Sequence, residues 1–359
     1  MYKPAVPPIE SLERLADSFA ALERPVERKR MLVIVNPYAT TVSDRLRNLV
    51  VYALQGRYDV DAIDTEGRDH ATELTREAAQ EGYDVVVAFG GDGTVNEAAN
   101  GLAHSPTPLT CLPGGATNVF CRMLGIPGDI VDATEHLLRV ADDWRPRPID
   151  LAHVNGRGFT FSAGVGLDAS VVRQVDAHPR LKAQLKQWYF TWAAVTTFAK
   201  DYVIRPPRLE VETDGRTLPG VTVVVQNGNL YTYYGSRSLH VAEDVELDDG
   251  TIGVMVLERS APIDMPTVTA RLLSERLRMV DHRRVSGFTT SGEVRVVSAD
   301  GRAVPVQVDG DYIGDATEAV FGTWPHALQV VAGGSSAGTT RDRPRGRRQA
   351  VRALTPCRT

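Results

Sequence analysis

The chain has 359 residues, of which 43% are hydrophobic and 24% are charged, and its formal net charge is -5. This composition is typical of a globular protein with enough residues for two domains. Three cysteines without a CxxC pattern argue against a disulfide framework or a zinc cluster and fit a reducing cytosol. No run approaches the ~20 apolar residues that span a bilayer, and the N-terminus lacks a signal-peptide core, so we expect a cytoplasmic protein.

Residues 1–30 form an N-terminal extension that is rich in proline and charge. Apolar side chains recur at helical spacing within it and predict a short amphipathic helix over Ser11–Glu23. Such a helix either docks on the main body or contacts a membrane or a second copy of the chain.

The main body begins with alternating strands and helices. Met31–Val35 predicts a buried strand, followed by a polar loop at residues 36–41. A helix is expected over Ser43–Gln55, then a strand over Tyr58–Ile63 and a helix over Asp69–Glu81 with Asp69 as its N-cap. This alternation predicts an α/β domain with a parallel sheet.

Two strand–glycine–helix units follow. The strand Asp84–Phe89 leads into Gly90–Thr94 and a helix from about Thr94, and the strand Leu109–Leu112 leads through two glycines into a helix from about Ala116. Glycines let backbone N–H groups approach a ligand, and a helix N-terminus is partly positive, so each turn predicts an anion site, most often for phosphate. One such turn is often a plain βα connection, but two about twenty residues apart are a stronger indication.

Asp92 lies between two glycines of the first turn. A carboxylate among phosphate-binding amides would repel phosphate unless a cation lay between them, and Mg²⁺ is the usual bridge. We therefore expect Asp92 to bind magnesium–nucleotide directly or through water. There is no Walker-type P-loop and no lysine in the glycine turns, so Mg²⁺, arginine and amides must neutralise the phosphates. Arg122 is a candidate for this role, or a solvated surface residue.

The loops after the four strands should meet at the carboxyl edge of the sheet, where ligands of α/β sheets bind. After Ile149 the pattern changes to short strands and DG or NG turns, which predict an antiparallel β-sandwich. We expect an α/β nucleotide-binding domain at 31–148, a β domain at 149–332 whose last residues can return to the first domain, and a tail at 333–359. The expected strands of the β domain are Asp150–Val154, Gly158–Ala163, Arg208–Thr213, Val221–Asn227, Thr251–Leu257, Arg283–Thr289, Glu293–Ser298 and Val304–Val308.

Two further segments have a distinct composition. Leu181–Tyr202 is densely aromatic with lysines, which suits either a core helix between domains or a membrane interface or acyl-chain groove. Ser335–Thr359 carries seven arginines and one aspartate and is expected to be disordered. This basic tail either solubilises the chain or attracts an anionic leaflet.

The motifs GGDGTVNEAANGL and LPGGATNVFCRMLGIP resemble the diacylglycerol kinase catalytic domain family, which includes soluble bacterial diacylglycerol kinases, sphingosine kinases and ceramide kinases. GGDGT alone is shared with NAD kinases, whereas the second motif is much more specific to the lipid kinases. The resemblance covers roughly Met31 to Ala332. It implies an α/β nucleotide-binding domain like that of NAD kinases and a mainly antiparallel β-sandwich, with the reaction in the cleft between them.

The same resemblance implies the functional residues. Asp309, in the sequence Asp309-Gly310-Asp311, matches the general base of the family, and Asp311 replaces a glutamate that supports it. The segment around Asp249 resembles a structural Mg²⁺ site formed by Asp249, the carbonyl of Thr251 and Glu246. The ATP site would comprise Asn36, Pro37, Tyr38, Ala39, Thr40, Thr65, Gly91, Asp92, Gly93, Thr94, Val95, Asn96, Glu97, Ala116 and Thr117.

Some positions depart from the family pattern. Thr40 and Thr41 stand where a glycine-rich continuation is usual, Ala116 lacks a hydroxyl that would contact nucleotide, and Val119 replaces an aspartate. Without the resemblance, the Asp-Gly pair at Asp309 would indicate only a turn.

The sequence thus predicts an ATP-dependent lipid kinase that uses Mg²⁺ and converts diacylglycerol to phosphatidic acid. Its lipid substrate would be met at a membrane surface, no nucleic-acid partner is expected, and a homodimer through sheet edges is compatible with the pattern. The alternatives are a kinase for another lipid alcohol, a sphingoid base or NAD, and a nucleotide- or lipid-binding regulator without catalysis.

Overall fold

The structure is a computed structural model that describes residues 28–140, 144–166, 169–170, 206–234, 237–241, 245–272, 274 and 277–332. The helix expected over Ser11–Glu23, the aromatic segment Leu181–Tyr202 and the tail Ser335–Thr359 lie outside these residues. In the described part, no helix is long and apolar enough to cross a membrane.

The first half, here called the N-lobe (residues 28–140), contains a parallel sheet in the order β2-β1-β3-β4. The central strands β1 and β3 are apolar and almost entirely buried, as is usual where helices cover both faces of a sheet. The strand bounds are β1 Arg30–Val35, β2 Asp59–Asp64, β3 Val85–Gly90 and β4 Leu109–Pro113.

The N-lobe helices pack in two pairs, α2 with α6 and α3 with α4. The connection through α2 leads from β1 to β2, and the connection through α3 leads back across the sheet to β3. Because crossovers of parallel strands are right-handed, these two helices cover opposite faces. Ser43 caps α2, since its hydroxyl accepts a hydrogen bond from the Leu46 amide. The bounds are α2 Asp44–Leu54, α3 His70–Glu81, α4 Asp92–Leu102, α5 Val119–Met123 and α6 Ile130–Val140.

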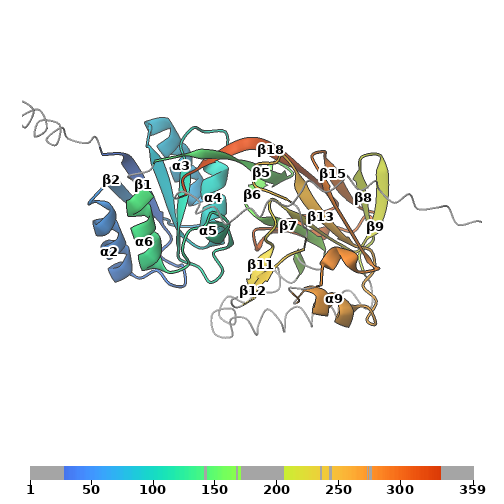
Figure 1. Ribbon diagram of the computed structural model, residues 1–359. Coiled ribbons are helices and arrows are strands. Elements are labelled where there is room, and N and C mark those ends of the chain that lie inside the picture. Colours follow the sequence, from blue (N-terminus) through green and yellow to red (C-terminus); the bar gives the residue numbers. More distant parts are fainter. Residues whose placement is uncertain are drawn as a thin grey trace, which may run out of the picture.

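The second half, here called the C-lobe (residues 144–332), is a two-layer sandwich that Figure 1 shows to the right of the N-lobe. One layer holds β5 Arg147–Val154, β6 Arg157–Phe159, β8 Leu209–Thr213, β9 Arg216–Gly220, β15 Val294–Ser298 and β18 Glu318–Val330. The other is antiparallel, in the order β14 Val285–Thr290, β13 Ile252–Leu257, β10 Thr222–Gln226, β7 Ser162–Gly166, β16 Val304–Val308 and β17 Asp311–Ala316. The predicted fold class is confirmed.

Smaller elements flank the sandwich. They are the hairpin β11 Thr232–Tyr234 and β12 Arg237–Leu239, the helix α9 Met265–Leu272 and a 3₁₀ turn at Met279–Asp281.

A single long strand, β18, joins the two lobes. It pairs antiparallel with β15 and β5, and near its end Val330 pairs parallel with Leu109 of β4. The sheet is therefore continuous through both lobes, and Figure 1 shows β18 arching between them. The boundary expected after Pro148 falls within β5, whose Ile149 packs in the core of the N-lobe.

The helices that follow the two glycine turns begin at other residues than predicted. α4 begins at Asp92, earlier than expected, whereas α5 begins only at Val119 and has 5 residues. Asn118 delays α5, because its backbone is left-handed (φ 47°) and its side-chain amide bridges the N–H and C=O of Gly115. The second unit is consequently a structured loop with one short helical segment.

Candidate active site

A cleft of about 450 Å³ lies where the N-lobe loops meet the β16–β17 hairpin of the C-lobe. Its N-lobe side comes from the carboxyl ends of β1, β2, β3 and β4, the edge at which the sequence predicts the nucleotide. The lining residues are Asn36, Ala39, Thr40, Thr65, Gly67, Arg68, Gly91, Gly93, Thr94, Glu97, Gly115 and Asp311.

Hydrogen bonds tie the strand ends of this edge together. The Asn36 side-chain amide donates to the Thr94 hydroxyl over 3.0 Å, which links the loop after β1 to the first turn of α4. The Asn36 backbone N–H donates to the Phe89 carbonyl, and the Thr65 N–H donates to the Val35 carbonyl. The polar side chains of three loops are thereby held at one end of α4, where the helix is partly positive.

Seven residues of the predicted ATP site do not line the cleft. Val95 is in the apolar core, and Asn96 is buried and turned toward the C-lobe. Asp92 and Thr117 contact each other, as described below. Pro37, Tyr38 and Ala116 are exposed outside the cleft.

The Asp92 carboxylate supports α5. One oxygen accepts from the Thr117 hydroxyl over 2.8 Å, and the other accepts from the Phe120 amide over 3.4 Å. Burial raises the pKa of Asp92 to about 6, against the lowering effect of the Thr117 hydrogen bond. Asp92 and Thr117 thus contact each other, and their predicted contact with magnesium–nucleotide stays a prediction.

In the C-lobe, the acidic loop at residues 246–251 is closed by hydrogen bonds to the carboxylate of Asp249. Asp249 accepts from the Thr251 N–H and hydroxyl through one oxygen and from the Glu246 N–H through the other, at 2.7–3.0 Å. No group of three His, Cys, Asp or Glu side chains suited to a metal ion occurs among the described residues. The predicted ligand set of Asp249, Glu246 and the Thr251 carbonyl includes a backbone oxygen and stays a prediction, and no step below passes through a magnesium there.

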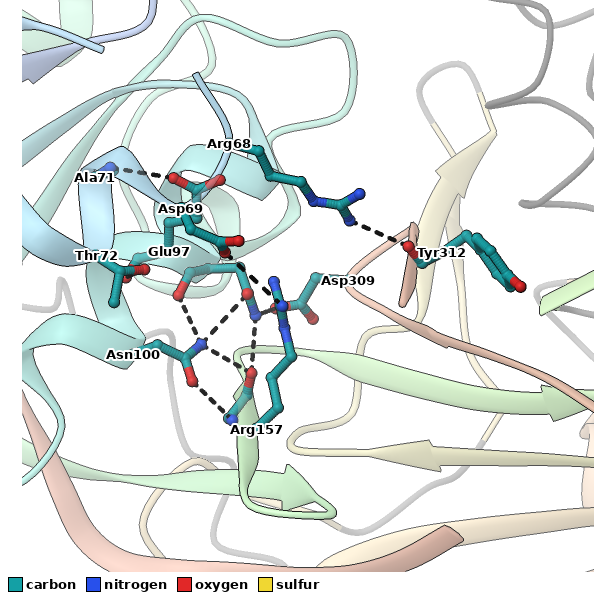
Figure 2. A network of polar contacts seen from close by, with 11 residues as sticks. Arg68, Asp69, Ala71, Thr72, Glu97, Asn100, Arg157, Asp309 and Tyr312 are labelled. Atoms are coloured by element: carbon teal, nitrogen blue, oxygen red, sulfur yellow. Dashed lines mark hydrogen bonds and ion pairs between the residues drawn. The ribbon is translucent and has the colours of Figure 1, made fainter. Parts of the chain in front are cut away.

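Asp309 is the centre of a buried network between the lobes (Figure 2). Its carboxylate accepts five hydrogen bonds of 2.7–3.1 Å, from the Asn96 side chain, from the N–H and hydroxyl of Thr160, and from the amides of Phe161 and Ser162. Burial raises the pKa of Asp309, and the hydrogen bonds from Thr160, Phe161 and Ser162 oppose that rise. Asp309 thus fastens the C-lobe to α4.

The backbone of the hairpin turn explains this inward position. Asp309 and Gly310 both have positive φ, 48° and 83°, and they form the two-residue connection between β16 and β17. Such primed turns match the twist of a hairpin. Asp311, the first residue of β17, then lies at the surface of the cleft.

Asp311 faces the first glycine turn across the cleft. Its Oδ2 lies 2.7 Å from the position that a Cβ on Gly93 would occupy. A carboxylate offers about four lone-pair sites, and the five donors to Asp309 already use them. Asp311 thus lines the cleft and Asp309 lies buried behind it. The roles predicted for these two carboxylates, Asp309 as base and Asp311 beside it, stay predictions.

Glu97 both lines the cleft and caps α3 (Figure 2). Its carboxylate accepts from the Ala71 N–H over 3.2 Å, and burial raises its pKa. The expected cap, Asp69, does occupy the N-cap position, but with φ 64° its side chain makes no capping hydrogen bond. That prediction was wrong, because the cap comes from the neighbouring helix.

Sequence reasoning missed three lining residues: Gly67, Arg68 and Gly115. The loop after β2 carries no recognisable motif beyond Thr65, so Arg68 gave no signal except its place at the same sheet edge. In the structure, the Arg68 guanidinium donates to the backbone carbonyl of Tyr312 over 3.1 Å (Figure 2). Arg68 thereby spans the two lobes at the mouth of the cleft.

Two family models match the two lobes in order. The diacylglycerol kinase catalytic domain matches residues 30–154, and the YegS C-terminal NAD kinase beta sandwich-like domain matches residues 161–332. Residues 30–154 therefore match the diacylglycerol kinase catalytic domain, the lipid kinase family that the two motifs resemble.

Relatives of known sequence and structure carry the name of the same family. A diacylglycerol kinase of Bacillus subtilis (strain 168) is 29% identical over 294 residues, which cover 80% of this chain and 91% of the relative. One from Staphylococcus aureus (strain RF122) is 27% identical over 297 residues, 80% of this chain and 87% of the relative. A crystal structure of a diacylglycerol kinase from Bacillus anthracis str. Sterne shares the fold of this lipid kinase, with a TM-score of 0.63 at 21% identity, over 86% of this chain and 98% of that one.

Proposed function

We propose that this lipid kinase transfers the γ-phosphoryl group of ATP to the free hydroxyl of diacylglycerol, giving phosphatidic acid. The observation that carries the proposal is the cleft in which the glycine turn and N-terminus of α4 face a carboxylate of the opposite lobe. The relatives named diacylglycerol kinase support the choice of acceptor. The reaction would occur at a bilayer surface on the cytoplasmic side, where the lipid lies.

Magnesium–ATP would enter as the substrate complex with its phosphates against Gly91–Thr94. Backbone amides and the partly positive end of α4 suit that position. Asn36 and Thr65 supply polar contacts from the neighbouring loops. Phosphoryl transfer depends mostly on positioning and electrostatics, and a two-sided cleft supplies both.

In the chemical step, the lipid oxygen forms a bond to the γ-phosphorus while the bond to the β,γ-bridging oxygen breaks and its electron pair leaves with ADP. The hydroxyl proton passes to the carboxylate of Asp311. Asp309 would act as a positioning residue, because its hydrogen bonds hold the hairpin that carries Asp311 against α4.

The test measures phosphate transfer from labelled magnesium–ATP to diacylglycerol in mixed micelles, a sphingoid base, a monoacylglycerol and NAD. Label in diacylglycerol is expected. Label in NAD alone would contradict the lipid reaction, and nucleotide binding without any transfer would favour a regulator.

The two carboxylates are separated by matched variants. Asp311→Asn should lower kcat by roughly 100-fold or more, the usual size of a general-base effect, with nucleotide binding and stability unchanged. Asp309→Asn should also lose activity but with a loss of about 1–3 kcal/mol in stability, because the new NH₂ group meets buried donors. A stable, inactive Asp309→Asn beside a fully active Asp311→Asn would return the role of base to Asp309.

A further inference from the structure

Charge is unevenly distributed in the cleft. Its lining contains two carboxylates, Glu97 and Asp311, and one cation, Arg68. Among the residues that the structure describes, no lysine lines it. A nucleoside triphosphate adds several negative charges to this site, so the electrostatic balance requires a positive group near the transferred phosphate.

Arg68 has the position and the chemistry for that task. It lies in the loop between β2 and α3, three residues after a buried lining residue, Thr65, and its side chain extends toward β17 (Figure 2). Among the described residues, no carboxylate lies within ion-pair distance of its guanidinium, whose recorded partner is the neutral carbonyl of Tyr312. A guanidinium has five N–H donors in a planar fork that matches phosphate oxygens.

The contact with Tyr312 adds a second role. Tyr312 follows Asp311 directly on β17, so Arg68 is bonded to the backbone beside the carboxylate that faces the acceptor. If some N–H groups of Arg68 donate to a phosphate while another donates to this carbonyl, Arg68 fixes the distance between that phosphate and the hairpin that carries Asp311.

We propose that Arg68 binds the terminal phosphate of the nucleotide and stabilises its charge during transfer, while its hydrogen bond to the Tyr312 carbonyl holds the Asp311 hairpin in line. The inference rests on the proposed phosphotransfer in this cleft. It makes Arg68 a catalytic residue supplied by the loop before α3, whereas the glycine turns supply only neutral donors.

The matched control is Arg76, which lies on α3, is exposed and is outside the cleft. Arg68→Gln, Arg68→Lys and Arg76→Gln would be compared in full-length protein by kcat for lipid phosphorylation. The loss of an arginine that stabilises a transferred phosphate is expected to lower kcat at least ~100-fold in Arg68→Gln. Arg68→Lys keeps the charge without the fork and should be intermediate, and Arg76→Gln should match the wild type.

Binding of nucleotide provides a readout independent of turnover. The affinities for ADP and for a non-hydrolysable ATP analogue would be measured with Mg²⁺ by calorimetry. Arg68→Gln should lower the affinity for the analogue about 10-fold and the affinity for ADP by less than about twofold, because only the analogue carries the terminal phosphate. Equal losses for both ligands, or kcat within about twofold of the wild type, would overturn the inference.

This pair of measurements separates the inference from the proposed function. If the wild type phosphorylates no lipid but Arg68→Gln still loses its preference for the ATP analogue, the phosphate contact stands and the acceptor is wrong. If lipid is phosphorylated and the preference is unchanged in Arg68→Gln, the kinase stands and Arg68 does not bind the terminal phosphate.

Discussion

The two strand–glycine–helix units, β3–α4 and β4–α5, lie side by side in the sheet, but their glycines face different partners. In the first unit, Gly91 and Gly93 line the cleft, and α4 starts at once and continues for 11 residues. In the second, a Cβ on Gly114 or Gly115 would lie within 2.9 Å of a backbone atom of the first turn. The first turn opens on the cleft, whereas the second, which reaches the cleft at Gly115, packs its two glycines against the first turn and carries a short helix.

The helices differ in the same way. α4 sends Asn96 to Asp309 and Glu97 to α3, so it connects three parts of the molecule. The first turn of α5 instead receives support from Asp92 of the first unit. A glycine turn before a helix is thus not sufficient for a phosphate site, because its amides must also face open space. Three experiments test this division, and they follow in order of expected effect.

Alanine substitutions at the glycines should separate the two units most clearly. Gly114→Ala puts a Cβ at 2.9 Å from Gly90 Cα and Val42 Cγ2, and we expect a loss of about 3 kcal/mol, the upper end for overpacking. Gly91→Ala meets Gly115 Cα at an ordinary 3.5 Å, so stability should change by less than about 0.5 kcal/mol while KM for ATP rises roughly 10-fold. Denaturant unfolding and kinetics of both variants measure this, and a destabilised Gly91→Ala with normal KM would break the comparison.

The support of α5 by Asp92 should depend on pH. Its folded pKa of about 6 lies above the ordinary value of 3.8, so its contribution to stability is complete below 3.8 and is lost as pH rises through about 6. Relative to Asp92→Asn, the wild-type free energy of unfolding should fall by about 1–2 kcal/mol across that window. Asp59→Asn, an exposed position on β2, serves as the control. A flat difference from pH 3.5 to 7 would show that Asp92 is not held in this surrounding.

The smallest expected effect concerns the cap that α4 gives to α3. Glu97→Ala removes the acceptor of the Ala71 N–H and should cost about 1 kcal/mol, the typical value of an N-cap. Asp69→Ala should cost less than about 0.5 kcal/mol, because its side chain makes no capping bond. Thermal melts of the two variants compare them, and the reverse order of stability would return the cap to Asp69.

Strong local patterns made most of the N-lobe predictable. β1 and β3 are continuous apolar runs, and their observed ends agree with the prediction to within one residue. The glycine turn of β3, with Asn36 and Thr65, also lines the cleft as the motifs indicate. These features depend on neighbours in sequence, which a pattern can record.

Other features depend on contacts that a pattern does not record. β18 was missed because Gly322 and Pro325 interrupt its apolar alternation, and the register shift between Trp324 and Leu328 accommodates that interruption. The burial of Asp309 and the place of Asp311 in the cleft depend on a turn with positive φ, and an Asp-Gly pair does not say which neighbour faces the cleft. The place of Arg68 between the lobes depends on its hydrogen bond to Tyr312, which is 244 residues away in the sequence.

The path of β18 also constrains how the protein is made. β4 is paired with β3 on one side, and its other side pairs with β18, near the end of the described chain. A ribosome completes β4 long before it reaches Val330, so a growing chain holds an N-lobe sheet whose β4 edge is unpaired through most of its synthesis. Open edges invite pairing with other chains. The nascent polypeptide should therefore depend on chaperones until β18 emerges and pairs with this edge.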